Sequence, residues 1–284
     1  MAFQQDHIQR YMTPEGTFRI LTADSTELIR EAAKRSKVST RVCESFGRLL
    51  TGAALMQLAQ SPVDRVQCRV FHSGSAGLML VDVWPGPKVR GRVAYPMASS
   101  EPIFGNEGTV GVSRQPLMRK AMPYESSVPL IDGDIGAALQ RFVLESEQVL
   151  TMFSLVCVVS DDGGIERAGG LLVQALPGWE HEHLSAVTAC LESRSFVDLV
   201  RAGDTPVKAT EAIFSGLSLH HVGYDPLVYE CRCSMDAAVR AVRLLDPVEL
   251  AEIECGKSEK VDCDFCGLSY VVDAAVLRAY PVDP

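Results

Sequence analysis

The sequence predicts an α+β protein. We expect a core of two mixed or antiparallel sheets with long helices, a helical linker, and a small C-terminal domain that carries four paired cysteines. The chain has 284 residues, 47% of them hydrophobic, which suffices for one large core and a smaller appended unit. Strand-like and helical patterns alternate up to about residue 178, and the paired cysteines all follow residue 230. The expected domains are therefore a core over residues 1–178, a linker over 179–230 and a C-terminal domain over 231–284.

The elements of the core are predicted from hydrophobic periodicity. A strand is expected at Phe18–Asp24 and a helix at Thr26–Lys34. The clearest helix runs from about Ser39 to Gln60, with apolar residues at helical spacing and Pro62 beyond its end. A second amphipathic helix is expected at Asp134–Glu147. The remaining strands are predicted at Arg65–Phe71, Gly77–Val83, Gly91–Ala94, Gly108–Val112, Thr151–Val159 and Ala168–Gln174.

Residues 179–230 have a different character from the core. Two short helices are predicted, His183–Leu191 and Pro206–Phe214, each with an apolar stripe. Helices of this length are not stable alone in water, so they must pack on another part of the protein. Loops are expected between and after them, at Arg201–Asp204 and His221–Pro226. A segment whose helicity depends on docking can switch between order and disorder.

The C-terminal stretch contains four thiols in two tight pairs, Cys231-x-Cys233 and Cys263-x-x-Cys266. Each pair is short enough for both sulfurs to face one point. Four thiolates form a closed tetrahedral site for zinc, and Gly267 lets the backbone turn back after the second pair. The spacing therefore predicts one Zn²⁺ held by these four cysteines.

A four-thiolate zinc site can be purely structural or can act as a redox switch. Zinc has no redox chemistry, but it holds cysteine as the oxidisable thiolate. An oxidised sulfur can close a disulfide with its neighbour, and the metal then loses ligands and its contribution to folding, roughly 10–16 kcal/mol. Most four-cysteine sites are purely structural, and this alternative stays open. The one-residue gap between Cys231 and Cys233 is unusual for a zinc ribbon and favours the switch.

The other five cysteines are interpreted as outside the metal site. Cys43, Cys68, Cys157 and Cys190 are expected to be packing residues. Cys255 lies between the two pairs in a turn, where we expect an exposed thiol that could react further. Its alternative role is ligand exchange within the second pair.

Other motifs that could carry chemistry have structural interpretations. The pair His181 and His183 has a metal-like spacing on a strand, but this stretch is predicted helical, and His220-His221 is likewise not assigned. The turn His72–Gly77 lacks the strand-to-helix context of a hydrolase elbow and predicts a hairpin. No catalytic constellation emerges, and the protein is not expected to be an enzyme.

The composition limits which classes of partner and which cellular compartment can be expected. A formal net charge of −9 without a long basic run argues against nucleic acid as a partner. No apolar stretch is long enough for a membrane span, and residues 1–12 lack an apolar signal core. Nine cysteines, an odd number, suit a reducing cytoplasm better than a disulfide-stapled secreted protein.

The chain resembles the redox-regulated heat-shock chaperones of about thirty-three kilodaltons, over nearly its whole length and in the family's order. The cysteine pattern and the Glu145–Gln148 segment are the specific parts of this resemblance, whereas the Arg-Gly-Arg stretch alone would be weak. The segments that carry it are Cys231–Ser234, Asp246–Leu250, Val261–Gly267 and Tyr270, and upstream Asp6–Tyr11, Val89–Ala94, Glu145–Gln148 and Ala168–Pro177.

The resemblance implies a stress-response chaperone that holds unfolding client proteins without ATP and is activated by oxidation. In the reduced form the four cysteines would bind one zinc ion. Oxidation would form the disulfides Cys231–Cys233 and Cys263–Cys266, release the zinc and expose the linker's apolar stripes. The family also implies a homodimer in the oxidised form. The alternative from the residues alone is an enzyme or interaction module with a purely structural zinc ribbon.

Overall fold

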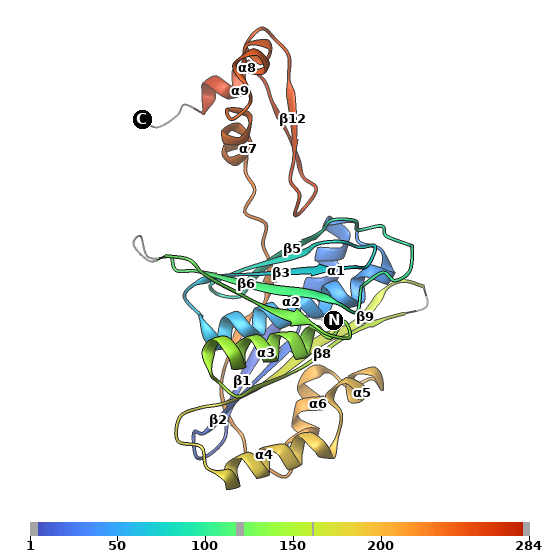
Figure 1. The fold of residues 1–284 in the computed structure, drawn as a ribbon, viewed down its shortest axis with the longest axis vertical. Coiled ribbons are helices and arrows are strands. Elements are labelled where there is room, and N and C mark those ends of the chain that lie inside the picture. Colours follow the sequence, from blue (N-terminus) through green and yellow to red (C-terminus); the bar gives the residue numbers. More distant parts are fainter. Residues whose placement is uncertain (1–4, 118–121, 161, 281–284) are drawn as a thin grey trace. The chain divides into compact units, whose positions relative to one another are not determined.

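The computed structural model describes residues 5–117, 122–160 and 162–280, and the chain divides into two compact units (Figure 1). The first unit ends at Glu230 and the second starts at Cys231. Helices and strands are mixed in both units, and the four paired cysteines all lie in the second. The predicted α+β fold class with its C-terminal four-cysteine unit is therefore confirmed. The proposed linker domain with a boundary at residue 178 stays a prediction.

The first unit contains two sheets. A five-stranded antiparallel sheet has the order β10-β1-β2-β9-β8, and a six-stranded sheet has the order β11-β5-β4-β3-β6-β7. The latter is mixed because β11 joins β5 in parallel. The strands of the first sheet are β1 (His7–Met12), β2 (Phe18–Asp24), β8 (Thr151–Val159), β9 (Ile165–Ala175) and β10 (His220–Pro226). Those of the second are β3 (Arg65–His72), β4 (Met79–Trp84), β5 (Lys88–Val93), β6 (Gly108–Gln115), β7 (Tyr124–Leu130) and β11 (Val228–Tyr229).

The long helix α2 (Thr40–Gln60) is the centre of the main core, because it contacts strands of both sheets. Its buried side chains lie on all sides of the helix rather than along one stripe, as expected for a helix between two sheets. Gly52 allows close packing at this point, since a Cβ there would lie 2.6 Å from Leu139 Cδ1 and that side chain would have to shift. Helices α1 (Thr26–Arg35) and α3 (Ile135–Glu147) complete this core.

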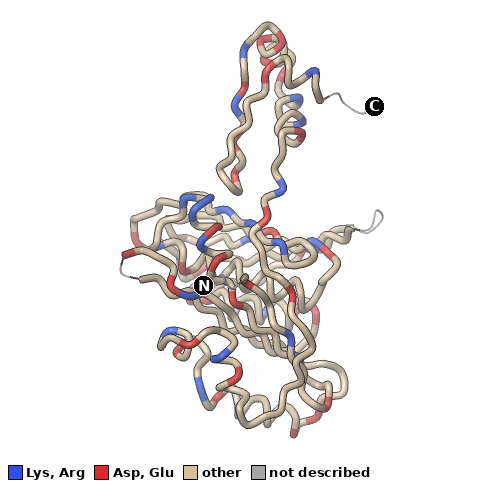
Figure 2. The backbone as a smooth tube through the Cα atoms, turned by 180° about the vertical axis from the view of Figure 1, so that it is seen from behind, with Lys and Arg blue, Asp and Glu red and all other residues tan. Residues whose placement is uncertain are grey.

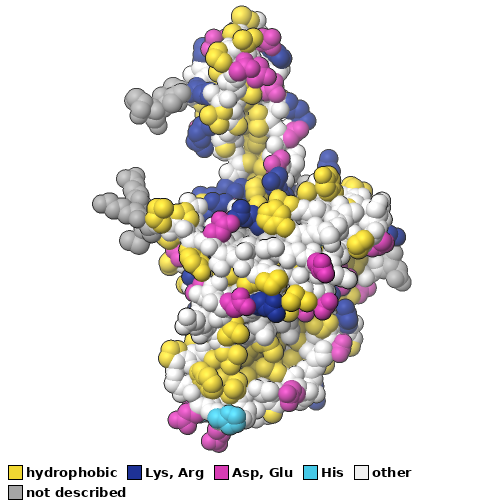
Figure 3. Space-filling view, viewed as in Figure 1, with side chains coloured by type: hydrophobic (Ala, Val, Ile, Leu, Met, Phe, Trp, Pro, Cys, Tyr) yellow, Lys and Arg dark blue, Asp and Glu magenta, His cyan; other side chains and the backbone are white. Residues whose placement is uncertain are grey.

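Three short helices, α4 (His181–Ser193), α5 (Phe196–Arg201) and α6 (Pro206–Ile213), pack on the five-stranded sheet and form a second apolar cluster with it. They bury Val187, Phe196, Val200, Ala209, Ile213 and Phe214 against residues of β2, β8 and β9. The expectation that these helices need a docking surface agrees with this packing. Figure 3 shows hydrophobic side chains gathered over this part of the unit.

The prediction of a loop at His221–Pro226 was wrong, because these residues belong to β10, which pairs antiparallel with β1. Most side chains of β10 are exposed, so the strand has no apolar alternation to reveal it. Its partner β1 lies more than 200 residues earlier in the chain and was also not predicted. Helix α5 was missed as well, because its six residues are too few to show a helical period.

The second unit is small. It contains helices α7 (Met235–Val242), α8 (Pro247–Glu254) and α9 (Ala274–Ala279) and one hairpin, β12 (Glu259–Asp262) with β13 (Ser269–Val272). Its buried apolar cluster comprises Ala238, Val239, Val242, Ile253 and Val272. A core of five mostly small side chains is little for an independent unit, and such units usually need a metal or disulfides.

Charges are interspersed along each unit (Figure 2). The clearest buried ion-pair network in the described part of the first unit surrounds Asp82, whose side chain has no exposed surface. Arg65 Nε lies 2.5 Å from Asp82 Oδ1, and Arg90 Nη2 lies 2.8 Å from Asp82 Oδ2. Across the described residues, no helix combines the length and the apolar character that crossing a membrane requires.

Candidate metal centre

Two local structures bring the four cysteines together. Cys263 and Cys266 lie in the turn of the β12–β13 hairpin, where Gly267 has φ of +68° and donates its N–H to the carbonyl of Cys263 at 2.8 Å. The Cys263 N–H in turn donates to Leu268 O at 2.8 Å. This is the knuckle expected for a Cys-x-x-Cys pair, with glycine at the one position that needs a left-handed backbone.

Cys231 and Cys233 lie just before α7. The helix begins directly after Ser234, whose side chain accepts a hydrogen bond from the backbone N–H of Ala237 at 3.1 Å. This cap fixes the direction in which the chain enters the helix. Because the backbone at Ser234 is extended, Cys231 and Cys233 lie before the helix, and both side chains can point towards the hairpin.

The four sulfurs form one cluster, with all Sγ atoms within 4.8 Å of one another. Cys231 Sγ lies 3.6 Å from Cys263 Sγ, and Cys233 Sγ lies 3.4 Å from Cys266 Sγ. Zinc–sulfur bonds of about 2.3 Å in a tetrahedron place sulfurs ~3.8 Å apart. The two shortest separations are slightly below this value and all are within 4.8 Å, so the donor set and its spacing fit a tetrahedral Zn²⁺.

The cluster is shielded unevenly. Cys266 is buried, and the other three cysteines are half-buried. Burial raises the pKa of Cys266, and hydrogen bonding with the neighbouring thiols raises it further. Four such sulfurs can all be thiolates only beside a cation that compensates their charge. A divalent ion is the natural counter-charge for this arrangement.

Tyr270 belongs to the site, although sequence reasoning assigned it no role there. It lies on β13 opposite Val261, and its hydroxyl donates a hydrogen bond to Cys233 Sγ at 3.1 Å. That bond, more than burial, raises the pKa of Tyr270 to about 12, so the phenol keeps its proton and remains a donor. Because 37 residues separate the partners, no local motif could have indicated the contact.

The remaining cysteines lie outside the cluster. Cys43, Cys68 and Cys157 are buried, and burial raises the pKa of their thiols to about 11, 12 and 12, which makes them inert packing groups. Cys190 is half-buried against the second apolar cluster. Cys255 is exposed at the C-terminal end of α8, as expected for a free thiol.

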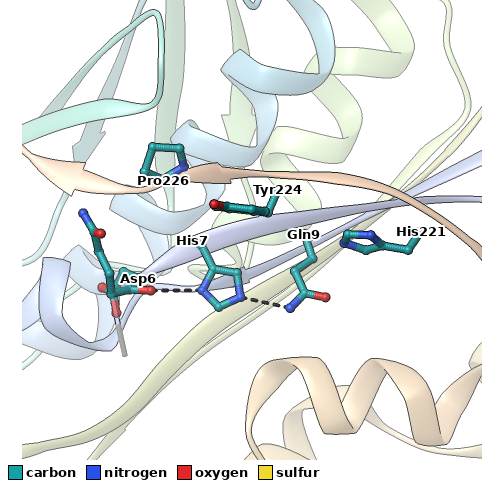
Figure 4. Close-up of a pocket in the computed structure, with 7 residues that line it drawn as sticks. Asp6, His7, Gln9, His221, Tyr224 and Pro226 are labelled. Atoms are coloured by element: carbon teal, nitrogen blue, oxygen red, sulfur yellow. Dashed lines mark hydrogen bonds between the residues drawn. The ribbon is translucent and has the colours of Figure 1, made fainter. Parts of the chain in front are cut away.

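No histidine joins a metal-binding group within the described ranges. Residues of β1 and β10, among them His7 and His221, line a cavity of about 310 Å³, and Figure 4 shows their side chains. The ring nitrogens of His7 are already partnered: Nδ1 bonds the Gln5 carbonyl at 3.0 Å, and Nε2 bonds the Gln9 amide at 3.0 Å. His183 is likewise engaged, since its Nδ1 accepts from the Glu180 N–H at 3.2 Å. These histidines do not form a second candidate site.

An α+β core followed by a compact four-cysteine unit defines the class: a protein whose small terminal domain contains a sulfur cluster with the geometry of a metal site. The Hsp33 protein family model matches residues 6–273, and the chain therefore belongs to the Hsp33 family. This confirms the resemblance described from the cysteine pattern.

Similar proteins carry the same family name. The 33 kDa chaperonin of Pelobacter propionicus is 32% identical over 285 residues, covering 96% of this chain and 93% of that protein. The 33 kDa chaperonin of Shouchella clausii is 27% identical, with 97% of both chains covered. The crystal structure of the 33 kDa chaperonin from Thermotoga maritima has a similar fold, with a TM-score of 0.86, 24% identity and 98% of both chains covered.

Proposed function

We propose that this member of a chaperone family is a cytoplasmic, ATP-independent holdase that oxidation activates. In the reduced protein Cys231, Cys233, Cys263 and Cys266 bind one Zn²⁺. Under oxidative stress the disulfides Cys231–Cys233 and Cys263–Cys266 form, and zinc leaves. The apolar faces of α4–α6 then become available to unfolding client proteins, and the active form is a homodimer. The observation that carries the proposal is the cluster of four sulfurs within 4.8 Å of one another.

The chemistry of the cluster supports redox control. Zinc would fix all four sulfurs as thiolates without reacting itself, and thiolates are the form that peroxide oxidises. The sulfurs are half-buried rather than fully enclosed, apart from Cys266, so an oxidant of the size of peroxide can reach them. Since zinc binding and folding are coupled in such small domains, oxidation of the ligands removes the contribution that keeps the unit folded.

The helices of the proposed linker offer the client surface. Helices α5 and α6 have six and eight residues, so their helicity depends on packing against the sheet. Their undocking would uncover both their own apolar faces and those of β2 and β9, including Phe18, Ile20 and Leu171. Exposed apolar area of this kind binds unfolded chains without directional contacts.

Independence from ATP is supported by the sequence. Its Gly256-Lys257-Ser258 triplet resembles the end of a phosphate-binding loop. That motif needs a glycine where this chain has Ala251, and the triplet follows helix α8 instead of preceding a helix. This stretch is therefore not a nucleotide-binding loop.

The proposal is tested by treating the reduced, zinc-loaded protein with peroxide at raised temperature. Zinc release is followed with a chromogenic chelator, and aggregation of a denatured client is followed by light scattering. We expect zinc release and client protection to rise together. Cys255→Ser is the matched control, because Cys255 is exposed and lies outside both the sulfur cluster and the apolar faces of α4–α6, so the variant should respond like the unchanged protein. Zinc retention with unchanged client protection would instead indicate a structural zinc ribbon.

A further inference from the structure

The four sulfurs of the cluster do not have equivalent surroundings. Cys233 Sγ accepts the hydrogen bond of the Tyr270 hydroxyl at 3.1 Å. Within the part of the chain that the structure describes, no hydroxyl or backbone N–H is seen to donate to Cys231 Sγ, whose sulfur contact is with Cys263 Sγ at 3.6 Å. The two members of the Cys-x-Cys pair are both half-buried, so burial does not distinguish them and the Tyr270 bond does.

A hydrogen bond to a thiolate lowers the reactivity of its sulfur. The O–H group draws electron density from the sulfur lone pair that would attack peroxide, and bonds to ionised acceptors are the strong ones. The aromatic ring of Tyr270 also lies against the second unit's apolar cluster, which fixes the direction of the hydroxyl. Tyr270 is half-buried, and its ring therefore restricts approach to the sulfur from that side.

We infer that Tyr270 is a positioning residue that sets the order of oxidation in the Cys-x-Cys pair, so that peroxide attacks Cys231 and Cys233 is the resolving thiol. This inference rests on the proposed function, because it concerns the oxidation of the same site. It adds a residue outside the ligand set and assigns different roles to two cysteines that the sequence motif treats alike.

The two steps balance as follows. The Cys231 thiolate attacks one oxygen of hydrogen peroxide, the O–O bond breaks, and sulfenic acid and hydroxide form. The Cys233 thiolate then attacks Cys231 Sγ, the S–O bond breaks, a second hydroxide leaves, and the disulfide forms. Two thiolates have lost two electrons in total, and one peroxide molecule has taken them up.

The test uses the full chain, reduced and zinc-loaded, with peroxide below one equivalent and excess dimedone to trap sulfenic acid. Trypsin cleaves after Arg232, so Cys231 and Cys233 fall in different peptides and mass spectrometry measures their adducts separately. We expect the adduct on Cys231 to exceed that on Cys233 by roughly three- to tenfold. This ratio follows if about half of the free energy of the hydrogen bond to the thiolate is added to the activation barrier for oxidation of Cys233.

Tyr270→Phe removes the hydroxyl and keeps the ring in the apolar cluster. In this variant we expect the ratio of adduct on Cys233 to adduct on Cys231 to rise about three- to tenfold, towards equal amounts. Tyr280→Phe is the matched control in the same unit, because the Tyr280 side chain has no bond to the cluster in the described structure, and it should leave the distribution unchanged. The zinc content of each reduced variant is measured first.

The inference is overturned if Cys233 carries as much adduct as Cys231 in the unchanged protein, or if Tyr270→Phe leaves the distribution as it was. If Tyr270→Phe loses zinc before oxidation, the test depends only on how the adduct is divided between Cys231 and Cys233 in the unchanged protein. Failure of the proposed function looks different: zinc release without client protection refutes the chaperone switch but leaves the adduct ratio, and its meaning, intact.

Discussion

Replacing Cys233 by serine should unfold the second unit while leaving the first intact. The unit's five buried apolar side chains contribute about 10 kcal/mol before the entropy of ordering the chain is subtracted. Structural zinc contributes roughly 10–16 kcal/mol, as much as this core or more. A site with three thiolates loses much of that contribution, and Cys233→Ser also removes the acceptor of the Tyr270 hydroxyl. The apolar core alone cannot then hold the unit together.

The assay is limited trypsin digestion of the reduced protein with its zinc content measured in parallel. Arg240 and Lys257 lie in the second unit, and we expect cleavage there to accelerate in Cys233→Ser, while a fragment ending near residue 230 persists. Cys255→Ser is the control, since Cys255 is exposed and outside the cluster. Full zinc content together with unchanged trypsin resistance in Cys233→Ser would refute the ligand assignment.

Three further predictions concern the first unit. Phe214, at the C-terminal end of α6, is 3% exposed, so Phe214→Ala should lower the unfolding free energy by about 3–5 kcal/mol. The variant should also show faster hydrogen exchange in α4–α6 and protect a client without oxidant. Unchanged exchange would contradict docking by apolar burial. Burial raises the pKa of Asp6 to about 7, so the folded state keeps a proton that the unfolded state releases, and stability should fall as pH rises from about 4 to about 7. Asp6→Asn should flatten that slope in urea titrations at several pH values, and an unaltered slope would show that another group causes it. Asp82→Asn leaves two half-buried arginines without their buried carboxylate and should lower the unfolding free energy by about 2–3 kcal/mol, whereas a loss below about 1 kcal/mol would show that they find other partners.

The parts that the sequence predicted are those whose causes are local. The range of β8 was predicted without error because Val, Leu and Phe are enriched over these residues, as is typical of a strand. Helix α2 was predicted to within one residue because apolar positions repeat over 21 residues. The cysteine cluster was foreseen for a similar reason, since Cys-x-Cys and Cys-x-x-Cys each aim two sulfurs at one point whatever the rest of the chain does.

The parts that the sequence missed depend on distant partners. Strand β10 was taken for a loop because its side chains are mostly exposed, and only the backbone of β1 makes it a strand. The hydrogen bond from Tyr270 to Cys233 joins residues of different motifs, and a tyrosine on a strand has no pattern that identifies its acceptor. In both cases the interaction is made by groups that hydrophobic periodicity does not describe.

The segment before the cysteines is held in two physically different ways. Helices α4–α6 are attached by buried apolar side chains, whereas β10 and β11 are attached mainly by backbone hydrogen bonds, with Leu227 as the buried anchor between them. Exposed backbone ladders open at low free-energy cost, but buried apolar faces open only when much of the cluster separates. The last attachment ends at Glu230, whose N–H donates to Val89 O at 2.9 Å, and Cys231 follows directly. In the proposed switch, a change at Cys231 would therefore act first on the weakly attached strands, and the apolar helices would open last.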